Sequence, residues 1–284
     1  SNPQWGGGGG CSTRRRGWLG GGGERSEAPA VSDRHHAPLT FRVLAVVYGA
    51  ACYLVFLASF LYAIGFVGNL VVPKSIDKGP QVSLAEALTA DLLLLGLFAV
   101  QHSVMARPSF KKWWTRFVPP PVERSSYVLA SSLLLLLLFW QWRPIPGAVW
   151  DVQQPVVAGV LLLVFGVGWL IVLVSTFLID HFDLFGLRQV YLYASRQPYT
   201  PPPFRAPALY RVVRHPIMLG FVVAFWATPT MTWGHLLFAG TTTAYLLVGV
   251  TLEEGDLRAA HGDDYEKYRQ RVSMIVPWRK KMEE

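Results

Sequence analysis

Long apolar segments alternate with polar loops along most of the chain. The length of the apolar segments is the main indication of the fold. A transmembrane helix needs about 20 predominantly apolar residues. Six apolar segments of roughly this kind cover residues 41–68, 84–105, 127–142, 155–179, 216–230 and 233–252. The third and fifth are short for full spans. The pattern predicts an all-α fold, a polytopic integral membrane helical bundle with about five to six transmembrane helices.

The last two apolar segments are separated only by Pro229-Thr230-Met231-Thr232. Because such a sequence favours a turn, these segments are expected to form a tight C-terminal helical hairpin. Composition agrees with a membrane protein, since 52% of the 284 residues are hydrophobic and only 15% are charged. The mean hydropathy of +0.31 is outside the range typical of soluble domains.

Basic residues indicate how the segments are oriented. Of the 26 Lys and Arg residues, 23 fall in alternate polar segments, which include both ends of the chain. By the positive-inside rule, both termini and the more basic loops are cytoplasmic, and six crossings fit this distribution. We expect an integral protein of the bacterial inner membrane. Anionic membrane lipid accounts for the net charge of +8, so a nucleic-acid partner is not required.

The first forty residues differ from the rest. Glycine runs and the triplet Arg14-Arg15-Arg16 are unsuited to a packed core, so residues 1–40 are interpreted as a disordered tail and residues 41–284 as the membrane domain. No short apolar run with a cleavage site follows the arginines, which argues against a signal peptide. The two cysteines, Cys11 and Cys52, do not suggest a disulfide framework or a thiolate metal site.

The start of the predicted hairpin carries basic chemistry. Pro216 suits the first turn of a helix, where its missing N–H group has no intrahelical partner to lose. Arg214 and His215 precede it, beside the free backbone N–H groups and the positive end of the helix dipole. This arrangement favours binding of a carboxylate.

The other end of the hairpin carries two acidic residues, Glu253 and Glu254. Carboxylates are disfavoured at the negative end of a helix, so a cation is expected to compensate them. That cation is either a protein group such as Arg258, four residues after Glu254, or a ligand with an ammonium or sulfonium group.

The C-terminal motifs resemble the isoprenylcysteine carboxyl methyltransferase-like group, which comprises membrane enzymes that use S-adenosyl-L-methionine. The resemblance rests on Arg-His-Pro-x-x-x-Gly from position 214, Glu-Glu-x-x-Leu from 253 and Gly-x-x-Tyr-x-x-Tyr from 262. It implies a cofactor-binding part at about residues 205–278. The cofactor-binding residues that it implies are Arg214, His215, Pro216, Glu253, Glu254, Tyr265 and Tyr268. The two tyrosines could instead anchor an amphipathic helix at the membrane interface.

The sequences at 101–108, 121–127, 139–144 and 175–186 support a narrower resemblance. They resemble the methanethiol S-methyltransferases, and the resemblance extends from about residue 40 to the end. Members of that family commonly carry Asn or a similar residue where Asp180 stands. The resemblance implies a small thiol as substrate, with conversion of methanethiol to dimethyl sulfide.

Methyl transfer to a thiol requires a thiolate, so the site needs a base or a cation that stabilises the anion. His102 and His181 are the candidate catalytic bases, with Asp183 expected to orient an imidazole. Asp91 and His102 are eleven residues apart and share a helix face. We expect a closed pocket near the cytoplasmic boundary, lined by the second, fourth and sixth apolar segments.

The sequence is also compatible with other functions. A related methyltransferase could act on a prenylcysteine carboxylate or another lipophilic acceptor. A haem- or quinone-binding redox protein could use His102, His181 and His215, and a transporter could use Asp91. The oligomeric state is unknown from the sequence.

Overall fold

The computed structural model describes residues 38–203 and 205–277. The tail predicted over residues 1–40 therefore lies, except for residues 38–40, outside the described residues. The first helix begins at Leu39, close to the predicted start of the membrane domain.

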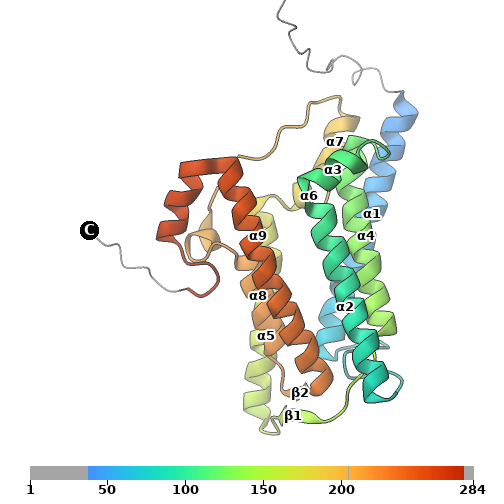
Figure 1. Ribbon diagram of the computed structural model, residues 1–284, viewed down its shortest axis with the longest axis vertical. Coiled ribbons are helices and arrows are strands. Elements are labelled where there is room, and N and C mark those ends of the chain that lie inside the picture. The colour runs from blue at the N-terminus through green and yellow to red at the C-terminus, as the bar shows by residue number, and fades with distance from the viewer. Residues whose placement is uncertain (1–37, 204, 278–284) are drawn as a thin grey trace, which may run out of the picture. The chain divides into compact units, whose positions relative to one another are not determined.

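Within the described residues, five helices are long and apolar enough to cross a membrane (Figure 1). They are α1 (Leu39–Gly68), α2 (Leu84–Ala106), α4 (Pro120–Gln141), α5 (Pro155–Ile179) and α9 (Trp233–Arg271). The predicted all-α membrane bundle is confirmed. Local sequence explains where helices start: Ser83 accepts a hydrogen bond from the Glu86 backbone N–H at 3.2 Å, and proline occupies the first turn of α4 and α5.

Shorter elements connect these helices. They are α3 (Pro108–Trp114), β1 (Ala148–Asp151), α6 (His181–Leu184), α7 (Leu187–Ala194), the 3₁₀ helix η2 (Ala208–Arg211), α8 (Pro216–Trp226) and β2 (Thr230–Thr232). The helix α3, the pair α6 and α7, and the far part of α9 all lie toward the same end of the long helices (Figure 1).

The C-terminal hairpin is present, but its first arm is shorter than the predicted apolar segment. With 11 residues and a rise of 1.5 Å per residue, α8 is about 16 Å long, roughly half of a bilayer core. The predicted turn at 229–232 is largely replaced by β2, which pairs antiparallel with β1. This pairing gives the backbone at 230–232 partners about 80 residues away, so the chain leaves the helix after Trp226.

Two glycines set the distance between α5 and α8. A Cβ atom added at Gly168 would come within 2.6 Å of the Ala224 backbone nitrogen and 2.8 Å of the Gly220 carbonyl oxygen. Glycine at both positions therefore permits a close approach of the two backbones. This contact holds the start of α8 next to the last turns of α5.

The aromatic core lies where α1, α2 and α4 meet α5, α8 and α9. Phe66 and Trp142 contact Phe238, and Phe225 packs edge-on against Phe238 with ring centroids 5.1 Å apart. All four belong to one buried cluster. Edge-to-face packing of this kind adds stability beyond the burial of apolar area.

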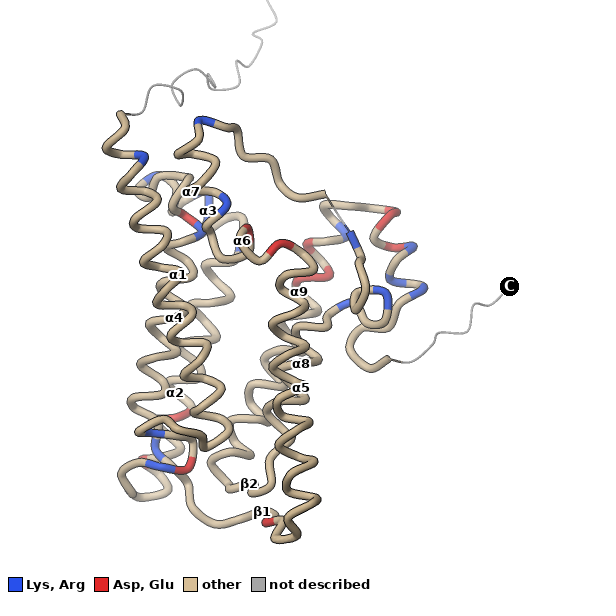
Figure 2. The backbone as a smooth tube through the Cα atoms, turned by 180° about the vertical axis from the view of Figure 1, so that it is seen from behind, with Lys and Arg blue, Asp and Glu red and all other residues tan. Residues whose placement is uncertain are grey.

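The outer surface is suited to lipid. Large side chains such as Leu61 and Leu163 are more than half exposed, and charged residues gather toward the two ends of the long helices and are sparse along their middle parts (Figure 2). A helix surface that faces the bilayer core is expected to be apolar, because charged side chains are costly there.

Replacing Gly220 with alanine is expected to destabilise the protein by about 1–3 kcal/mol, because the added methyl group overpacks the contact with α5. Gly166→Ala on α5 is the matched control, since nothing lies within 4 Å of a Cβ there; it should leave stability unchanged or slightly raised. Thermal unfolding of the detergent-solubilised variants measures both. Equal stability of the two variants would contradict the close packing.

Candidate functional site

A cavity of about 720 Å³ lies at the junction of α5, α6, α8 and α9. Its walls include most of the residues that the sequence singled out. Those on the wall are Asp180, His181, Arg214, His215, Glu253, Tyr265 and Tyr268. The predicted lining by the fourth and sixth segments is correct, because α5 and α9 both contribute. The predicted lining by the second segment is wrong, since no residue of α2 is on the wall; α2 packs mainly against α4.

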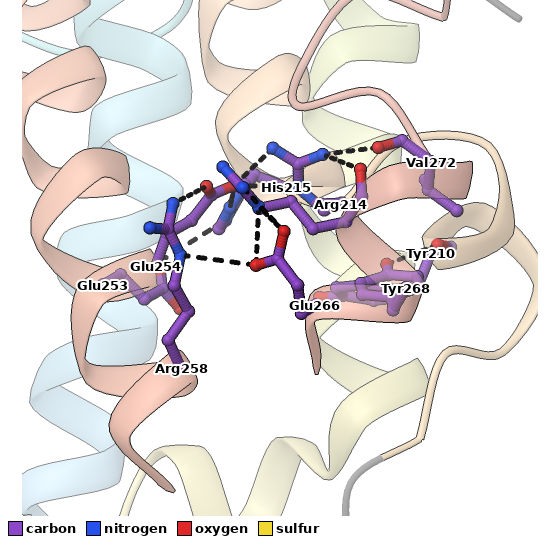
Figure 3. A network of polar contacts seen from close by, with 10 residues as sticks. Tyr210, Arg214, His215, Glu253, Glu254, Arg258, Glu266, Tyr268 and Val272 are labelled. Carbon is purple, nitrogen blue, oxygen red and sulfur yellow. Dashed lines mark hydrogen bonds and ion pairs between the residues drawn. The ribbon is translucent and has the colours of Figure 1, made fainter. Parts of the chain in front are cut away.

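Arg214, which is on this wall, forms a buried ion pair with Glu254 (Figure 3). An Arg214 guanidinium nitrogen, Nη2, lies 2.6 Å from Glu254 Oε1, and both side chains are less than 8% exposed. The Nε2 atom of His215 lies 3.2 Å from the same oxygen. Arg258, the local partner considered from sequence, lies 3.8 Å away and is half exposed. The cation that compensates Glu254 is therefore Arg214.

Arg214 also ties the end of α9 to the start of α8. Its Nη1 donates to the carbonyl oxygens of Arg269 and Val272, and its backbone N–H donates to the Ser273 carbonyl at 2.8 Å. The next N–H, of His215, donates to Met274 at 3.1 Å. Because carbonyls at a helix C-terminus have no intrahelical partner, one arginine both satisfies these groups and fixes the returning chain.

Glu253 differs from its neighbour in environment. Its side chain is 51% exposed and lies on the cavity wall, 3.5 Å from His215 Nδ1. Of the two acidic residues, Glu253 is therefore the one exposed at the cavity, whereas Glu254 is enclosed by protein groups.

Three tyrosines stand near this carboxylate. Gly262 has φ 52° and ψ −127°, a conformation that glycine adopts without strain, and here α9 turns back on itself (Figure 1). The turn brings Tyr265 and Tyr268 to the cavity, with ring centroids 6.0 Å apart. The Tyr268 hydroxyl donates to the Tyr210 carbonyl (Figure 3). Burial, and then the nearby Glu253, raise the pKa of Tyr210, so its phenol stays neutral.

His181 also lies on the cavity wall, at the start of α6. It is buried, and its ring stacks on Phe177 with centroids 4.2 Å apart. The hydroxyls of Tyr53 and Thr176 each lie 2.8 Å from one of its ring nitrogens. Burial lowers the pKa of His181, so the imidazole is neutral at neutral pH.

Asp183 does not orient this imidazole, contrary to the prediction. Its carboxylate instead accepts hydrogen bonds from Arg188 at 3.0 Å and from the Tyr199 hydroxyl at 3.2 Å. Residues two apart on a helical turn point in different directions, which separates Asp183 from His181. Asp180 caps α6 by accepting from the Asp183 N–H at 3.1 Å and has φ 121°, which asparagine and aspartate tolerate better than most residues.

His102 is placed in a different cluster, between α2 and α4. The Tyr127 hydroxyl lies 3.0 Å from its Nδ1 atom, and its ring stacks on Phe98. It is not part of the cavity wall. Asp91, on the same helix, accepts a hydrogen bond from the Arg143 backbone N–H at 2.9 Å and belongs to neither site. The structure therefore brings His181, but not His102, to the cavity.

Sequence reasoning missed several residues of the site. Thr176 falls within the motif at 175–186 but carries no charge, and Tyr53 lies in an apolar segment without any motif. Tyr210 and Arg205 precede the basic motif at position 214 and also line the cavity. An excess of tyrosine and arginine just before that motif is the one signal that could have drawn attention to these two.

Replacing Arg214 with alanine is expected to destabilise the protein by about 3–5 kcal/mol, because it leaves the Glu254 carboxylate buried without its partner. The control is Arg258→Ala, which removes a half-exposed partner of the same carboxylate and should cost under about 1 kcal/mol. Denaturant unfolding in detergent micelles measures both. Similar losses in the two variants would contradict the role given to Arg214.

Known proteins that are similar to this chain indicate its family. The model of the NnrU protein family matches residues 92–268. The methanethiol S-methyltransferase of Mycobacterium tuberculosis is 60% identical over 237 residues, which cover 84% of this chain and 97% of that protein. Methanethiol S-methyltransferase 1 of Bradyrhizobium diazoefficiens is 58% identical, covering 84% of each chain. The methanethiol S-methyltransferase of Crocosphaera subtropica is 54% identical, covering 84% and 93%. These relatives confirm the narrower resemblance, and no solved structure matches the chain.

Proposed function

We propose that this chain, which belongs to the NnrU protein family, is a membrane methyltransferase that converts methanethiol to dimethyl sulfide. The observation that carries the proposal is the similarity, at 54–60% identity over 84% of the chain, to relatives named for that activity. The cavity beside α8 is the proposed site of reaction.

S-Adenosyl-L-methionine is the proposed methyl donor. When bound, it supplies an electrophilic methyl group on a sulfonium centre. The residues present fit such a molecule: the half-exposed Glu253 carboxylate and the tyrosine rings suit a sulfonium cation, and the start of α8 at Pro216 suits a carboxylate. A volume of about 720 Å³ is in the range of small-molecule sites.

The seven residues assigned to the donor divide into two kinds in this proposal. Glu253, His215, Tyr265 and Tyr268 face the donor, whereas Arg214 and Glu254 act mainly through the ion pair that positions the others. Pro216 begins α8 and leaves the N–H groups of its first turn to the donor's carboxylate.

Apolar side chains line part of the cavity. They include Phe177 and Phe182, whose rings contact that of His181, and Ile217 and Met218 at the start of α8. A methanethiol-sized molecule offers almost no hydrogen-bonding groups, so apolar walls suit it. Attack of a thiolate on a sulfonium removes a pair of opposite charges, and a site that excludes water favours that step. His181 is the proposed base, and its place on the cavity wall favours it over His102.

The protein is proposed to act at the cytoplasmic face of a bacterial inner membrane. The basic loops support this orientation by the positive-inside rule, and the cavity lies toward the same end of the bundle as α3, α6 and α7. The proposed partners are a small thiol substrate and membrane lipid.

Headspace gas analysis of the purified protein tests the activity. With S-adenosylmethionine and a panel of thiols, dimethyl sulfide is expected from methanethiol at a higher rate than the product of any larger thiol. Methylation of a prenylcysteine carboxylate but of no small thiol would replace the proposal with that of the lipophilic acceptor.

Glu253→Gln is expected to weaken binding of S-adenosylmethionine about tenfold or more, because one contact between opposite charges is lost, worth about 1.5–3 kcal/mol. Asp256→Asn is the matched control on the same helix; Asp256 pairs with Arg107 and is not on the cavity wall. Titration calorimetry measures both variants. Unchanged affinity in Glu253→Gln would remove Glu253 from the donor site.

The pH dependence of the reaction is expected to identify the base. Because neutral His181 takes the proton and burial lowers its pKa, kcat/KM should rise with pH through an apparent pKa below about 6.5. His181→Ala should abolish this limb and His102→Ala should keep it. Profiles measured for both variants and the wild type decide the matter; a limb lost only in His102→Ala would reverse the assignment.

A further inference from the structure

The hydrogen bonds around His181 determine which of its ring nitrogens carries the proton. The Thr176 hydroxyl donates its one hydrogen to the Leu173 carbonyl at 2.7 Å. Its oxygen also lies 2.8 Å from His181 Nδ1. A hydroxyl that gives its one hydrogen to a carbonyl can only accept from a second partner, and in that arrangement Nδ1 is the nitrogen that bears hydrogen.

The other ring nitrogen then carries a lone pair. A neutral imidazole has one N–H donor and one acceptor nitrogen, and burial keeps His181 neutral by lowering its pKa. The Tyr53 hydroxyl lies 2.8 Å from Nε2 and therefore donates to it. Tyr53 belongs to α1, 128 residues before His181, so the acceptor nitrogen is held from a different part of the bundle.

Aromatic contacts fix the plane of the ring. Phe177 stacks on it with an interplanar angle of 3°, and Phe185 packs edge-on at 4.8 Å. The Phe185 ring in turn stacks on Phe56 of α1 at 3.8 Å. With its plane and both nitrogens held, the imidazole has little freedom to rotate toward another partner.

We propose that Tyr53 and Thr176 are positioning residues that hold His181 as the neutral Nδ1–H tautomer, with the Tyr53 hydroxyl as the route by which a proton reaches Nε2. The proposal rests on the proposed function, in which a thiol gives up a proton beside His181. His181 is on the cavity wall and its Nε2 atom is held by Tyr53, so in this proposal a proton from the substrate reaches the ring through the Tyr53 oxygen.

The thiol S–H bond breaks and its proton binds the Tyr53 oxygen, while the hydrogen that Tyr53 first carried moves to His181 Nε2. The electron pair left on the thiol sulfur forms the new bond to the donor's methyl carbon, and the electrons of the broken bond stay with the donor. His181, now an imidazolium, releases its proton to water.

Several charged groups share the cavity with His181 and affect any pH profile. They are Asp180 beside it, Arg188 of α7, Arg205 of the loop that follows α7, Arg214 and His215 at the start of α8, and Glu253 and His261 of α9. A measurement of the tautomer at constant charge is therefore the more direct test.

Nitrogen-15 NMR of the full chain, labelled at histidine and free of substrates, measures the tautomer. The His181 signal is assigned by its loss in His181→Gln. We expect the Nδ1–H form in the wild type and in Thr176→Ser, and a shift to the Nε2–H form in Thr176→Val, which has no acceptor for Nδ1. An Nε2–H wild type, or a tautomer unchanged in Thr176→Val, would overturn the proposal.

The rate of methyl transfer tests whether the proton passes through the Tyr53 hydroxyl. General acid–base catalysis is worth about 10²–10⁴ in rate, so Tyr53→Phe should lower kcat at least about tenfold and alter the low-pH limb, with donor affinity unchanged. The control is Tyr48→Phe. Tyr48 lies on the same helix as Tyr53, but its hydroxyl bonds Ser126, so this variant should keep the wild-type rate. Wild-type kcat and an unaltered limb in Tyr53→Phe would refute the relay.

The two measurements separate this proposal from the proposed function. If the wild type methylates methanethiol but Tyr53→Phe does so equally well, the relay fails and the methyltransferase stands. If the wild type makes no dimethyl sulfide, the proposed function fails and the relay fails with it. The tautomer measured by NMR then still decides whether Tyr53 and Thr176 position His181.

Discussion

Two opposite charges are buried together where α8 begins and the apolar part of α9 ends. Removing a guanidinium and a carboxylate from water costs several kcal/mol for each ion, and the cost is offset only when the geometry is close and the remaining polar atoms are satisfied. Arg214 and Glu254 meet these conditions, with a distance of 2.6 Å and further hydrogen bonds from Arg214 to the carbonyls of Arg269 and Val272. Because one arginine holds both α9 and the returning chain, the placement of Glu253, Tyr265 and Tyr268 depends on this pair.

Backbone geometry complements the ion pair from both sides. The contact of Gly168 with Gly220 brings the start of α8 to the end of α5, and the positive φ of Gly262 allows α9 to turn back. Without a close helix contact the basic end of α8 would lie farther from His181, and without the turn the tyrosines would continue away along α9. Three glycines and one ion pair thus assemble the cavity from segments that are far apart in sequence.

Hydropathy was sufficient to predict the bundle because a bilayer imposes length and apolarity on each span independently of its neighbours. Arg214, His215 and Glu253 could be brought together from sequence because an apolar hairpin returns its two ends to one side. The end of α8 could not be predicted, since it depends on β2 pairing with β1, some 80 residues earlier. Two other contacts also join residues far apart in sequence and leave no local pattern. One is the pairing of Glu254 with Arg214, and the other is the contact of Tyr53 with His181. The assignment of Asp183 to a histidine failed for a local reason, because the turn between α6 and α7 brings Arg188, five residues later, to the Asp183 carboxylate.

We propose that the buried pair holds the site together and that Glu253 and the tyrosines, rather than the paired charges, contact the donor. A double-mutant cycle with Arg214→Met and Glu254→Leu, read out as both unfolding free energy and S-adenosylmethionine affinity of the folded fraction, tests it most directly. We expect each single change to destabilise the protein strongly and the double variant to recover part of the loss, since an apolar pair avoids a lone buried charge. The folded double variant should bind the donor within about tenfold of the wild type, or about 1.4 kcal/mol. A stable double variant that no longer binds the donor would refute this arrangement, because the two charges would then be direct ligands.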